Sequence, residues 1–307
     1  SELSVGAYKR VLLKLIIVVL VVYLVCSIID IVRNKIFHVI KRALSEDINY
    51  IDLATDLLIP EDEISTAEFV SKAEGVLAGI DCALRTFTFI DSGVKCEVFI
   101  HDGEKVKKGD IIARVQGKTR SILKAECTSL NILQHMSGVA TATNKLVEAC
   151  AGTKASIVDT RKTLPGLRAL EKYAVTAGGG RNHRYNLSDA AMLKDNHIDA
   201  YGGITGAVTA LKKKIGHMAK IEVEVRNKEE LIEALGCNVD VIMLDNMTPE
   251  EMTECVKIAD GKAVLEASGN INIDTVAAAA ATGVDIISVG AITHSVKAFD
   301  ISLKIRK

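Results

Sequence analysis

Six short apolar runs in the second half of the chain each end in polar or charged residues that could do chemistry. The runs are residues 156–158, 191–193, 221–225, 241–244, 264–265 and 286–289. The residues at or soon after their ends include Arg161, Lys162, Lys194, Glu224, Asp245, Glu266, Ser268, Gly269, Gly290 and His294. One charged run end is ordinary solvation, but six in succession indicate a single shared site.

Positive charge is concentrated in one segment of a nearly neutral chain. The whole sequence has a formal net charge of −1, yet seven cationic residues lie between Asp159 and His197 against four acids. The cations are Arg161, Lys162, Arg168, Lys172, Arg181, Arg184 and Lys194, and the acids are Asp159, Glu171, Asp189 and Asp195. A guanidinium fork binds a planar carboxylate with two hydrogen bonds. The segment therefore predicts a small substrate with several negative charges.

Two acids on neighbouring runs, Glu224 and Asp245, offer hard oxygen ligands. Such ligands suit Mg²⁺ when a substrate phosphate completes the site, or they could bind ribose hydroxyls. Other common sites have no support, because the chain lacks a Walker motif, a GxGxxG after a predicted strand and a GxSxG elbow. Its seven cysteines form no CxxC pair, which favours reduced thiols over a zinc site or disulfides. The net charge argues against a nucleic-acid partner.

Amphipathic segments alternate with the apolar runs, and this predicts how the polar run ends are positioned. The predicted helices are residues 167–176, 206–215, 228–235, 249–259 and 273–281. Strands and helices that alternate at this spacing form a parallel sheet with crossover helices. Six repeats favour an open α/β barrel of the TIM type, in which ligands bind at the carboxyl ends of the strands.

The first half of the chain has a different pattern. Residues 65–117 are predicted to be rich in β-structure, with two strands inside 98–117 around turns at Asp102-Gly103 and Lys108-Gly109-Asp110. Apolar residues at helical spacing then predict a helix over 121–149, with Gly138 as a candidate break. Aromatic residues are 4% of the sequence and Trp is absent, so the core must be mainly aliphatic.

An apolar segment at residues 11–32 stands apart from the rest of the sequence. Only Lys14 and Asp30 interrupt it. As a helix it would be about 33 Å long, enough to cross a bilayer. The slightly richer basic flank on its C-terminal side favours a cytoplasmic body. We therefore expect an apolar N-terminal helix over 1–35 that serves as a single membrane anchor. A buried or oligomer-packed helix is the alternative.

Eight strings together resemble the quinolinate phosphoribosyltransferases, also called nicotinate-nucleotide pyrophosphorylases (carboxylating). They are LNILQHMSGVATAT (130–143), DTRKTLPGLRALEKYAV (159–175), GGGRNHR (178–184), LKDNHI (193–198), EVEV (222–225), MLDNM (243–247), LEASGN (265–270) and SVGAITHS (288–295). The resemblance covers about residues 36–307. It implies an α/β fold with an N-terminal α/β sandwich lobe over 36–137, an open TIM-like barrel over 138–295, and a segment 296–307 that returns to the first lobe.

The resemblance also implies a reaction. Members of the family are homodimers or higher homo-oligomers that join quinolinate to phosphoribosyl pyrophosphate with Mg²⁺, releasing pyrophosphate and CO₂ to give nicotinate mononucleotide in de novo NAD biosynthesis. Carried onto this sequence, the quinolinate carboxylates would contact Arg161, Lys162, His183 and Arg184. Lys194 would lie between the two substrates, and Glu224 and Asp245 would face the ribose hydroxyls and, directly or indirectly, the metal. The phosphate pocket would contain Ser268, Gly269, Gly290 and His294. Lys162, Lys194, Glu224 and Asp245 are the predicted catalytic residues.

One position departs from the family in a way that bears on binding. The family has Glu-Arg-Thr before the LN motif, whereas this chain has Glu126-Cys127-Thr128. In the family that arginine enters the partner subunit's site and binds a substrate carboxylate, which Cys127 cannot do. A lost charge-assisted hydrogen bond costs about 1.5–3 kcal/mol. Arg120 or Arg181 could substitute for it. Thr176 is a second departure, at a position that is often basic in the family.

Two alternatives stay open at this stage. The chain could act on another pyridine or pyrimidine acid, which a substrate panel would reveal. It could also be a membrane-tethered binding or scaffold protein of weak activity, which would bind ligand without releasing pyrophosphate. A barrel aldolase fits less well, because Lys194 is followed by Asp195, Asn196 and His197, and a polar setting would not lower the pKa of a Schiff-base lysine.

Overall fold

The computed structural model describes residues 36–306, which belong to two compact units that divide between Ile51 and Asp52. The described part of the first unit is helical over 36–47. The predicted apolar helix at 1–35, and the membrane anchor within it, lie outside the described residues. Within 36–306, no helix combines the length and the apolar character needed to cross a membrane.

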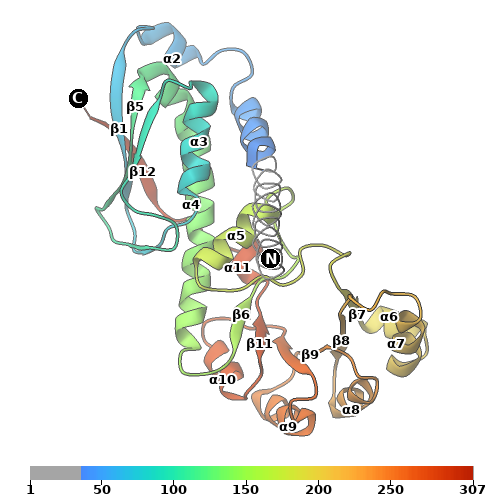
Figure 1. Ribbon diagram of the computed structural model, residues 1–307. Helices are drawn as coiled ribbons and strands as arrows, with labels where there is room; N and C mark the ends of the chain where they lie inside the picture. The colour runs from blue at the N-terminus through green and yellow to red at the C-terminus, as the bar shows by residue number, and fades with distance from the viewer. Residues whose placement is uncertain (1–35, 307) are drawn as a thin grey trace, which may run out of the picture. The chain divides into compact units, whose positions relative to one another are not determined.

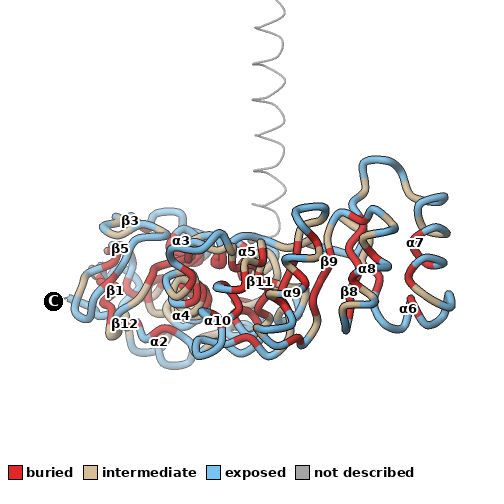
Figure 2. The backbone as a smooth tube through the Cα atoms, turned by 90° about the horizontal axis from the view of Figure 1, so that it is seen from below, coloured by how far each residue is buried: buried red, intermediate tan, exposed pale blue. Residues whose placement is uncertain are grey.

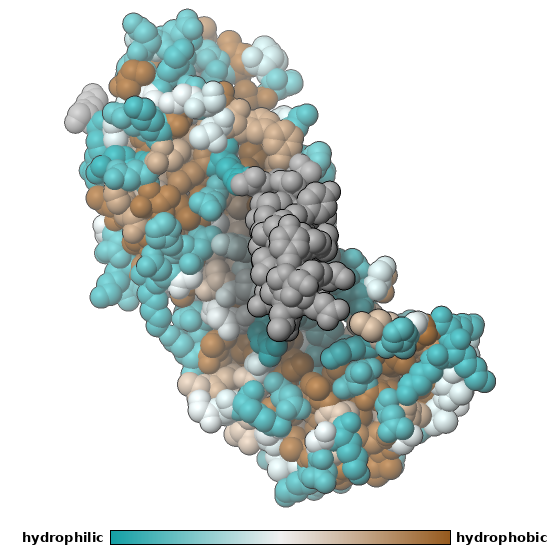
Figure 3. Space-filling view, in the orientation of Figure 1, coloured by the Kyte–Doolittle hydropathy of each residue, from teal (hydrophilic) through white to brown (hydrophobic). Residues whose placement is uncertain are grey.

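The second unit begins with an N-terminal lobe built on a four-stranded antiparallel sheet (Figure 1). Its strand order is β12-β1-β5-β3. The strands are β1 (Ile64–Ser71), β3 (Lys95–Val98), β5 (Ile111–Lys118) and β12 (Ile301–Arg306). The pairing of β12 with β1 brings the C-terminal segment back onto this lobe. On the face visible in Figure 3, hydrophilic and apolar side chains are interspersed over the lobe.

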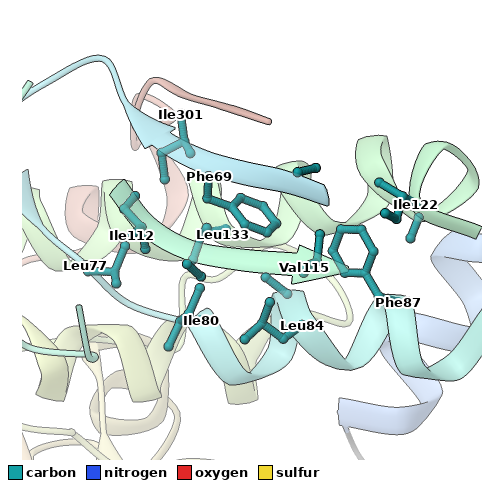
Figure 4. Close-up of a cluster of buried hydrophobic side chains, with 14 of the residues drawn as sticks. Phe69, Leu77, Ile80, Leu84, Phe87, Ile112, Val115, Ile122, Leu133 and Ile301 are labelled. Atoms are coloured by element: carbon teal, nitrogen blue, oxygen red, sulfur yellow. The ribbon is translucent and has the colours of Figure 1, made fainter. Parts of the chain in front are cut away.

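The sequence prediction of a β-rich segment over 65–117 is wrong for α3 (Ile80–Ile90), which lies in the middle of it. The helix buries Ile80, Leu84 and Phe87, which recur at helical spacing on its inner face. Figure 4 shows these side chains packed with Phe69 and Leu133 against the inner face of the sheet. Phe69 and Phe87 meet edge to face with ring centroids 5.9 Å apart, a contact that adds about 0.5–1.5 kcal/mol to their burial.

The two strands predicted within 98–117 do not pair with each other. Instead β4 (Lys105–Val106) pairs with β2 (Gly75–Val76), and β5 pairs with β1 and β3. The turn between β4 and β5 bonds to β1 instead of closing a hairpin, since Gly109 N donates to Ser71 O and Ser71 N donates to Asp110 O. These long-range bonds could not be read from the turn residues.

A single helix of 31 residues, α4 (Thr119–Ala149), contacts both halves of the second unit. Figure 1 shows it running from the N-terminal sheet to the barrel, and it packs against both α3 and α5. The predicted break at Gly138 is absent. A Cβ atom at this position would lie 2.4 Å from the carbonyl oxygen of Lys297. The glycine therefore serves close packing of the C-terminal segment and leaves the helix intact.

The C-terminal half of the second unit contains a six-stranded sheet in which every neighbouring pair is parallel. Its strands are β6 (Ser156–Val158), β7 (Ala191–Leu193), β8 (Ile221–Val225), β9 (Val241–Asp245), β10 (Val264–Ser268) and β11 (Ile286–Ser288). The order β6-β11-β10-β9-β8-β7 leaves β6 and β7 as the edge strands, which do not pair with each other, so the barrel is open. The predicted α/β fold class is confirmed, and the six strands begin where the apolar runs begin.

Helices on the outside of the barrel follow the predicted segments closely. They are α5 (Arg168–Ala177), α7 (Ile204–Lys212), α8 (Lys228–Gly236), α9 (Pro249–Ala259) and α10 (Val276–Ala281), and the short helices α2 (Leu53–Leu58), α6 (Asp195–Ala200) and α11 (Ala291–His294) were not predicted. The start of α9 has a local cause, because Thr248 and Glu251 form a capping box and Pro249 is its first residue. Figure 2 shows buried residues along β8, β9 and β11.

We expect Gly138→Ala to destabilise the protein. Alanine favours a helix over glycine by about 1 kcal/mol, but its methyl group would overlap Lys297 O and Val296 Cγ1. Overpacking of this kind costs about 1–3 kcal/mol. Gly236→Ala is the matched control, because Gly236 lies in α8 and nothing would contact its Cβ within 4 Å. In urea unfolding, the free energy of unfolding should fall for Gly138→Ala and change little for Gly236→Ala. Equal effects would refute the packing role of Gly138.

Candidate active site

A pocket of about 820 Å³ lies at the carboxyl ends of the barrel strands. It is lined by all but one of the residues predicted from the sequence. These are Arg161, Lys162, His183, Arg184, Lys194, Glu224, Asp245, Ser268, Gly269, Gly290 and His294. They come from the carboxyl ends of β8, β9 and β10 and from the segments that follow β6, α5, β7, β10 and β11. Parallel strands bring their carboxyl ends to one rim.

Cys127 is the exception. It is an exposed residue of α4 and does not line the pocket. The two arginines considered as substitutes do not line it either. Arg120 Nε donates to the carbonyl of Ile59 at 2.7 Å, in the N-terminal lobe. Arg181 is exposed, and its backbone bridges to Val158.

Two guanidinium groups face the same end of the pocket. Burial lowers the pKa of Arg184, and the nearby positive charge of Arg161 lowers it further. Arg184 is held by a hydrogen bond to the carbonyl of Ala190 at 2.8 Å. The Nε atom of Arg161 is buried and has no hydrogen-bond partner. Two like charges with an unused donor form a site that an anion would stabilise.

Lys194, which follows β7, and Glu224 of β8 form an ion pair at the pocket. Lys194 Nζ lies 2.9 Å from Glu224 Oε2, and the Lys194 side chain is 48% exposed. The position of Lys194 is fixed by its role as N-cap of α6, where its backbone N–H donates to Nδ1 of His197 at 3.1 Å. His197 therefore orients the strand end and does not line the pocket.

Asparagines position the carboxylate at the end of β9. Asn246 Nδ2 donates to Asp245 Oδ2 at 2.8 Å, and Asn270 Nδ2 donates to Asn246 Oδ1 at 3.2 Å. Gly269 is required here, because its φ is +95° and a Cβ would lie 2.2 Å from Asn246 Oδ1. The glycine in the predicted phosphate pocket thus also allows Asn246 to reach its place beside Asp245.

Beneath His183 lie two buried glutamates for which the sequence analysis assigned no role. His183 Nε2 is 3.2 Å from Glu222 Oε2 and 3.4 Å from Glu266 Oε2. Glu222 is 5% exposed and Glu266 is 1% exposed, and one oxygen of each has no hydrogen-bond partner. The sequence signal for Glu222 and Glu266 is an acid inside an otherwise apolar strand, as in IEVEV and VLEAS. In the described part of the chain, these three residues are also the group whose ligand atoms lie close enough, within 4.8 Å, to hold a metal ion.

The two carboxylates set the charge of His183. Burial alone lowers the pKa of its ring, but hydrogen bonds to Glu222 and Glu266 outweigh burial and raise the pKa to about 10. One contact opposes the cation, because the N–H of Arg184 donates to Nδ1 at 2.8 Å, which needs a neutral ring. Both carboxylates lie against the single Nε2–H, and their negative charges favour the protonated ring. Burial also raises the pKa of Glu266, and the charge of Glu222 adds to this effect.

Replacing both acids, as Glu222→Gln with Glu266→Gln, should change the pH dependence of stability. Because the pKa of His183 is raised in the folded state, its charge stabilises the fold fully below about pH 6.5 and this is lost as the pH rises toward 10. Between about pH 6 and about pH 10, the free energy of unfolding should fall on the order of 3 kcal/mol more in the wild type than in the double variant. Urea unfolding across this pH range measures the free energy of unfolding of the wild type and of the double variant. Parallel curves would show that Glu222 and Glu266 do not raise the pKa of His183.

Comparison with known proteins gives a consistent assignment. Residues 52–137 match the N-terminal domain of quinolinate phosphoribosyl transferase, and residues 139–304 match its C-terminal domain. The chain is 42% identical over 260 residues to a probable nicotinate-nucleotide pyrophosphorylase (carboxylating) of Bacillus subtilis, covering 85% of this chain and 90% of that protein. It is 43% identical over 286 residues to quinolinate phosphoribosyltransferase (decarboxylating) 1b of Nicotiana tabacum, covering 87% and 81%.

A solved structure agrees with these relatives. The nicotinate-nucleotide pyrophosphorylase of Francisella tularensis superposes with a TM-score of 0.86 at 43% identity, covering 89% of this chain and 96% of that one. The resemblance drawn from the sequence motifs is confirmed. The chain belongs to the quinolinate phosphoribosyltransferase family.

Proposed function

We propose that this chain joins quinolinate to phosphoribosyl pyrophosphate, yielding nicotinate mononucleotide, pyrophosphate and CO₂. The main support is one pocket that combines a cationic end, with Arg161, Lys162 and Arg184, and an acidic end, with Glu224 and Asp245. A dicarboxylate and a ribosyl pyrophosphate need these two environments side by side. The names of the relatives agree with this substrate pair.

The cationic end would bind and orient quinolinate. Arg161 offers a buried Nε–H that has no partner within the protein, and Arg184 lies close enough for the two charges to repel. A carboxylate between them would relieve this repulsion and accept hydrogen bonds from both. Lys162 and His183 line the same pocket and add positive charge. Fixing the ring in this way brings its nitrogen toward the sugar and lowers the entropic cost of reaction.

The acidic end would act on the sugar. As the ring nitrogen attacks the anomeric carbon and the pyrophosphate leaves, positive charge develops on the ribose. Glu224 and Asp245 lie where carboxylates would stabilise that charge. Lys194, whose side chain is half exposed and bonded to Glu224, would neutralise the leaving pyrophosphate. Ser268, Gly269, Gly290 and His294 would bind the phosphate on the sugar.

For the loss of CO₂, the protein need only position the departing carboxylate and limit its contact with water. Once glycosylated, the ring nitrogen is cationic and can accept the electron pair left on the neighbouring carbon when its carboxylate departs. That carbon then takes up a proton. The acids beside His183 are buried, so their charges act in a medium of low dielectric constant.

Magnesium fits the donor set of the acidic end. Glu224 and Asp245 provide hard oxygen ligands from the neighbouring strands β8 and β9, and Mg²⁺ usually takes one or two carboxylates together with substrate phosphates. When bound it would neutralise phosphate charge. The buried cluster of His183, Glu222 and Glu266 suits Mg²⁺ less well, because it includes an imidazole.

Assembly and location also belong to this proposal. A homodimer or higher oligomer is expected from the family, with the catalytic body in the cytoplasm and residues 11–32 as its membrane anchor. The chemistry above does not depend on the anchor, since every pocket residue comes from the barrel. The second candidate function is the same transfer to a related acid. Its support is that Cys127 stands where the family has arginine.

Turnover of quinolinate with phosphoribosyl pyrophosphate and Mg²⁺ tests the function directly. We expect nicotinate mononucleotide and CO₂ from quinolinate, and no product from nicotinate, which lacks the departing carboxylate. Arg161→Ala should lower kcat/KM for quinolinate by about 10- to 100-fold, the effect of removing one charged hydrogen-bonding group. Product from neither acid would overturn the proposal in favour of another substrate.

Cys127→Arg should improve quinolinate binding if a second copy brings residue 127 to the pocket. A restored charge-assisted bond of about 1.5–3 kcal/mol would lower KM by roughly 10- to 150-fold. Cys127→Lys is the control, since it restores charge without the planar fork. An unchanged KM in both variants would show that residue 127 does not contact the substrate.

A further inference from the structure

Helix α5 has a polar inner face that none of the proposed chemistry uses. Arg168, Glu171 and Lys172 lie at positions i, i+3 and i+4, so they share one side of the helix. Glu171 is fully buried and Lys172 is 3% exposed. None of the three lines the pocket. Buried charged groups are costly unless they are paired or hydrogen-bonded, so their partners indicate what this face is for.

The partners of Arg168 lie on two separate loops of the pocket. Its Nε donates to Thr163 Oγ1 at 3.0 Å and its NH2 group donates to the carbonyl of Arg161 at 3.2 Å. Its NH1 group donates to the carbonyl of Tyr185 at 3.2 Å. One guanidinium therefore joins the loop after β6, residues 160–164, to the loop before β7, residues 182–185.

Glu171 and Lys172 hold the same two loops, one each. Glu171 Oε2 accepts the backbone N–H of Leu164 at 3.2 Å, while Oε1 lies 2.9 Å from Nε2 of His135 on α4. Lys172 Nζ forms a buried ion pair with Asp159 and donates to the carbonyl of His183 at 3.0 Å. Asp159 completes this arrangement by accepting the backbone N–H of His183 at 2.9 Å.

We propose that Arg168, Glu171 and Lys172 are positioning residues for quinolinate, because together they fix the two loops that carry Arg161, Lys162, His183 and Arg184. The four side chains would otherwise repel one another, and two short loops have no secondary structure to resist this. Six of the bonds above end on backbone groups or on Thr163 of these loops, so they set the loop path rather than touching a ligand. The inference rests on the proposed function for the identity of the ligand.

Arg168→Met is the main test, because Arg168 is only half-buried and its loss leaves no buried acid unpaired. The KM for quinolinate should rise about 10- to 100-fold, since misplacing reacting groups by about 1 Å costs this much. The KM for phosphoribosyl pyrophosphate should change less, because Arg168 bonds to neither Glu224 nor Asp245. Arg168→Lys should give an intermediate KM, since an ammonium cannot bond both loops as a fork does.

Arg114→Met is the matched control. Arg114 also makes three side-chain hydrogen bonds, to Glu68 and Glu97, but it lies in the N-terminal sheet. Its loss should leave both KM values unchanged. For the buried pair, Lys172→Met is combined with Asp159→Asn, which avoids an unpaired buried charge, and this double variant should also raise the KM for quinolinate.

Hydrogen exchange separates failure of this inference from failure of the proposed function. Without any ligand, Arg168→Met should accelerate amide exchange in residues 160–164 and 182–185 and nowhere else in the barrel. If the wild-type protein fails to turn over quinolinate, the proposed substrate is wrong, but the positioning role of Arg168, Glu171 and Lys172 is unaffected. Unchanged exchange in these loops, or an unchanged KM for quinolinate in an active Arg168→Met variant, would overturn the positioning role.

Discussion

The constraint on which this structure depends is the mutual repulsion of the cations at one end of the pocket. Arg161 and Arg184 are close enough for one charge to lower the pKa of the other, and Lys162 and His183 line the same pocket. Such a cluster binds anions well because it is held together before the anion arrives. The energy to hold it must come from elsewhere in the fold.

Three kinds of contact supply that energy. Backbone carbonyls hold the cations themselves, as Ala190 does for Arg184. Buried acids in the strands, Glu222 and Glu266, balance the charge of His183 from below. The polar face of α5 fixes the loops from the side through Arg168 and Lys172. A buried acid without a cation would be strongly destabilising. The buried acids and the cations of the pocket therefore stabilise each other.

The sequence predicted the barrel well because its strands are short, apolar and separated by amphipathic helices. The starts of all six strands agree, and eleven predicted residues line one pocket, since parallel strands can only bring their carboxyl ends together. The N-terminal lobe was harder. Helix α3 was missed among strands, and Gly138 suggested a break that long-range packing against Lys297 explains instead. Glu222 and Glu266 were visible in the sequence, but their partner His183 is far away in the chain, so only the folded structure shows the cluster.

The family resemblance placed both the barrel pocket and position 127 at the substrate. The structure of one chain separates them. Every predicted residue that lines the pocket comes from the barrel, whereas Cys127 lies on the exposed surface of α4. The substitution therefore leaves the arrangement of cations and acids within one chain as it is. Its influence on binding can arise only where another copy brings α4 to the rim of this pocket. The chemistry of the pocket and the contribution of position 127 are thus physically independent, and a weak response to quinolinate would not by itself count against the barrel site.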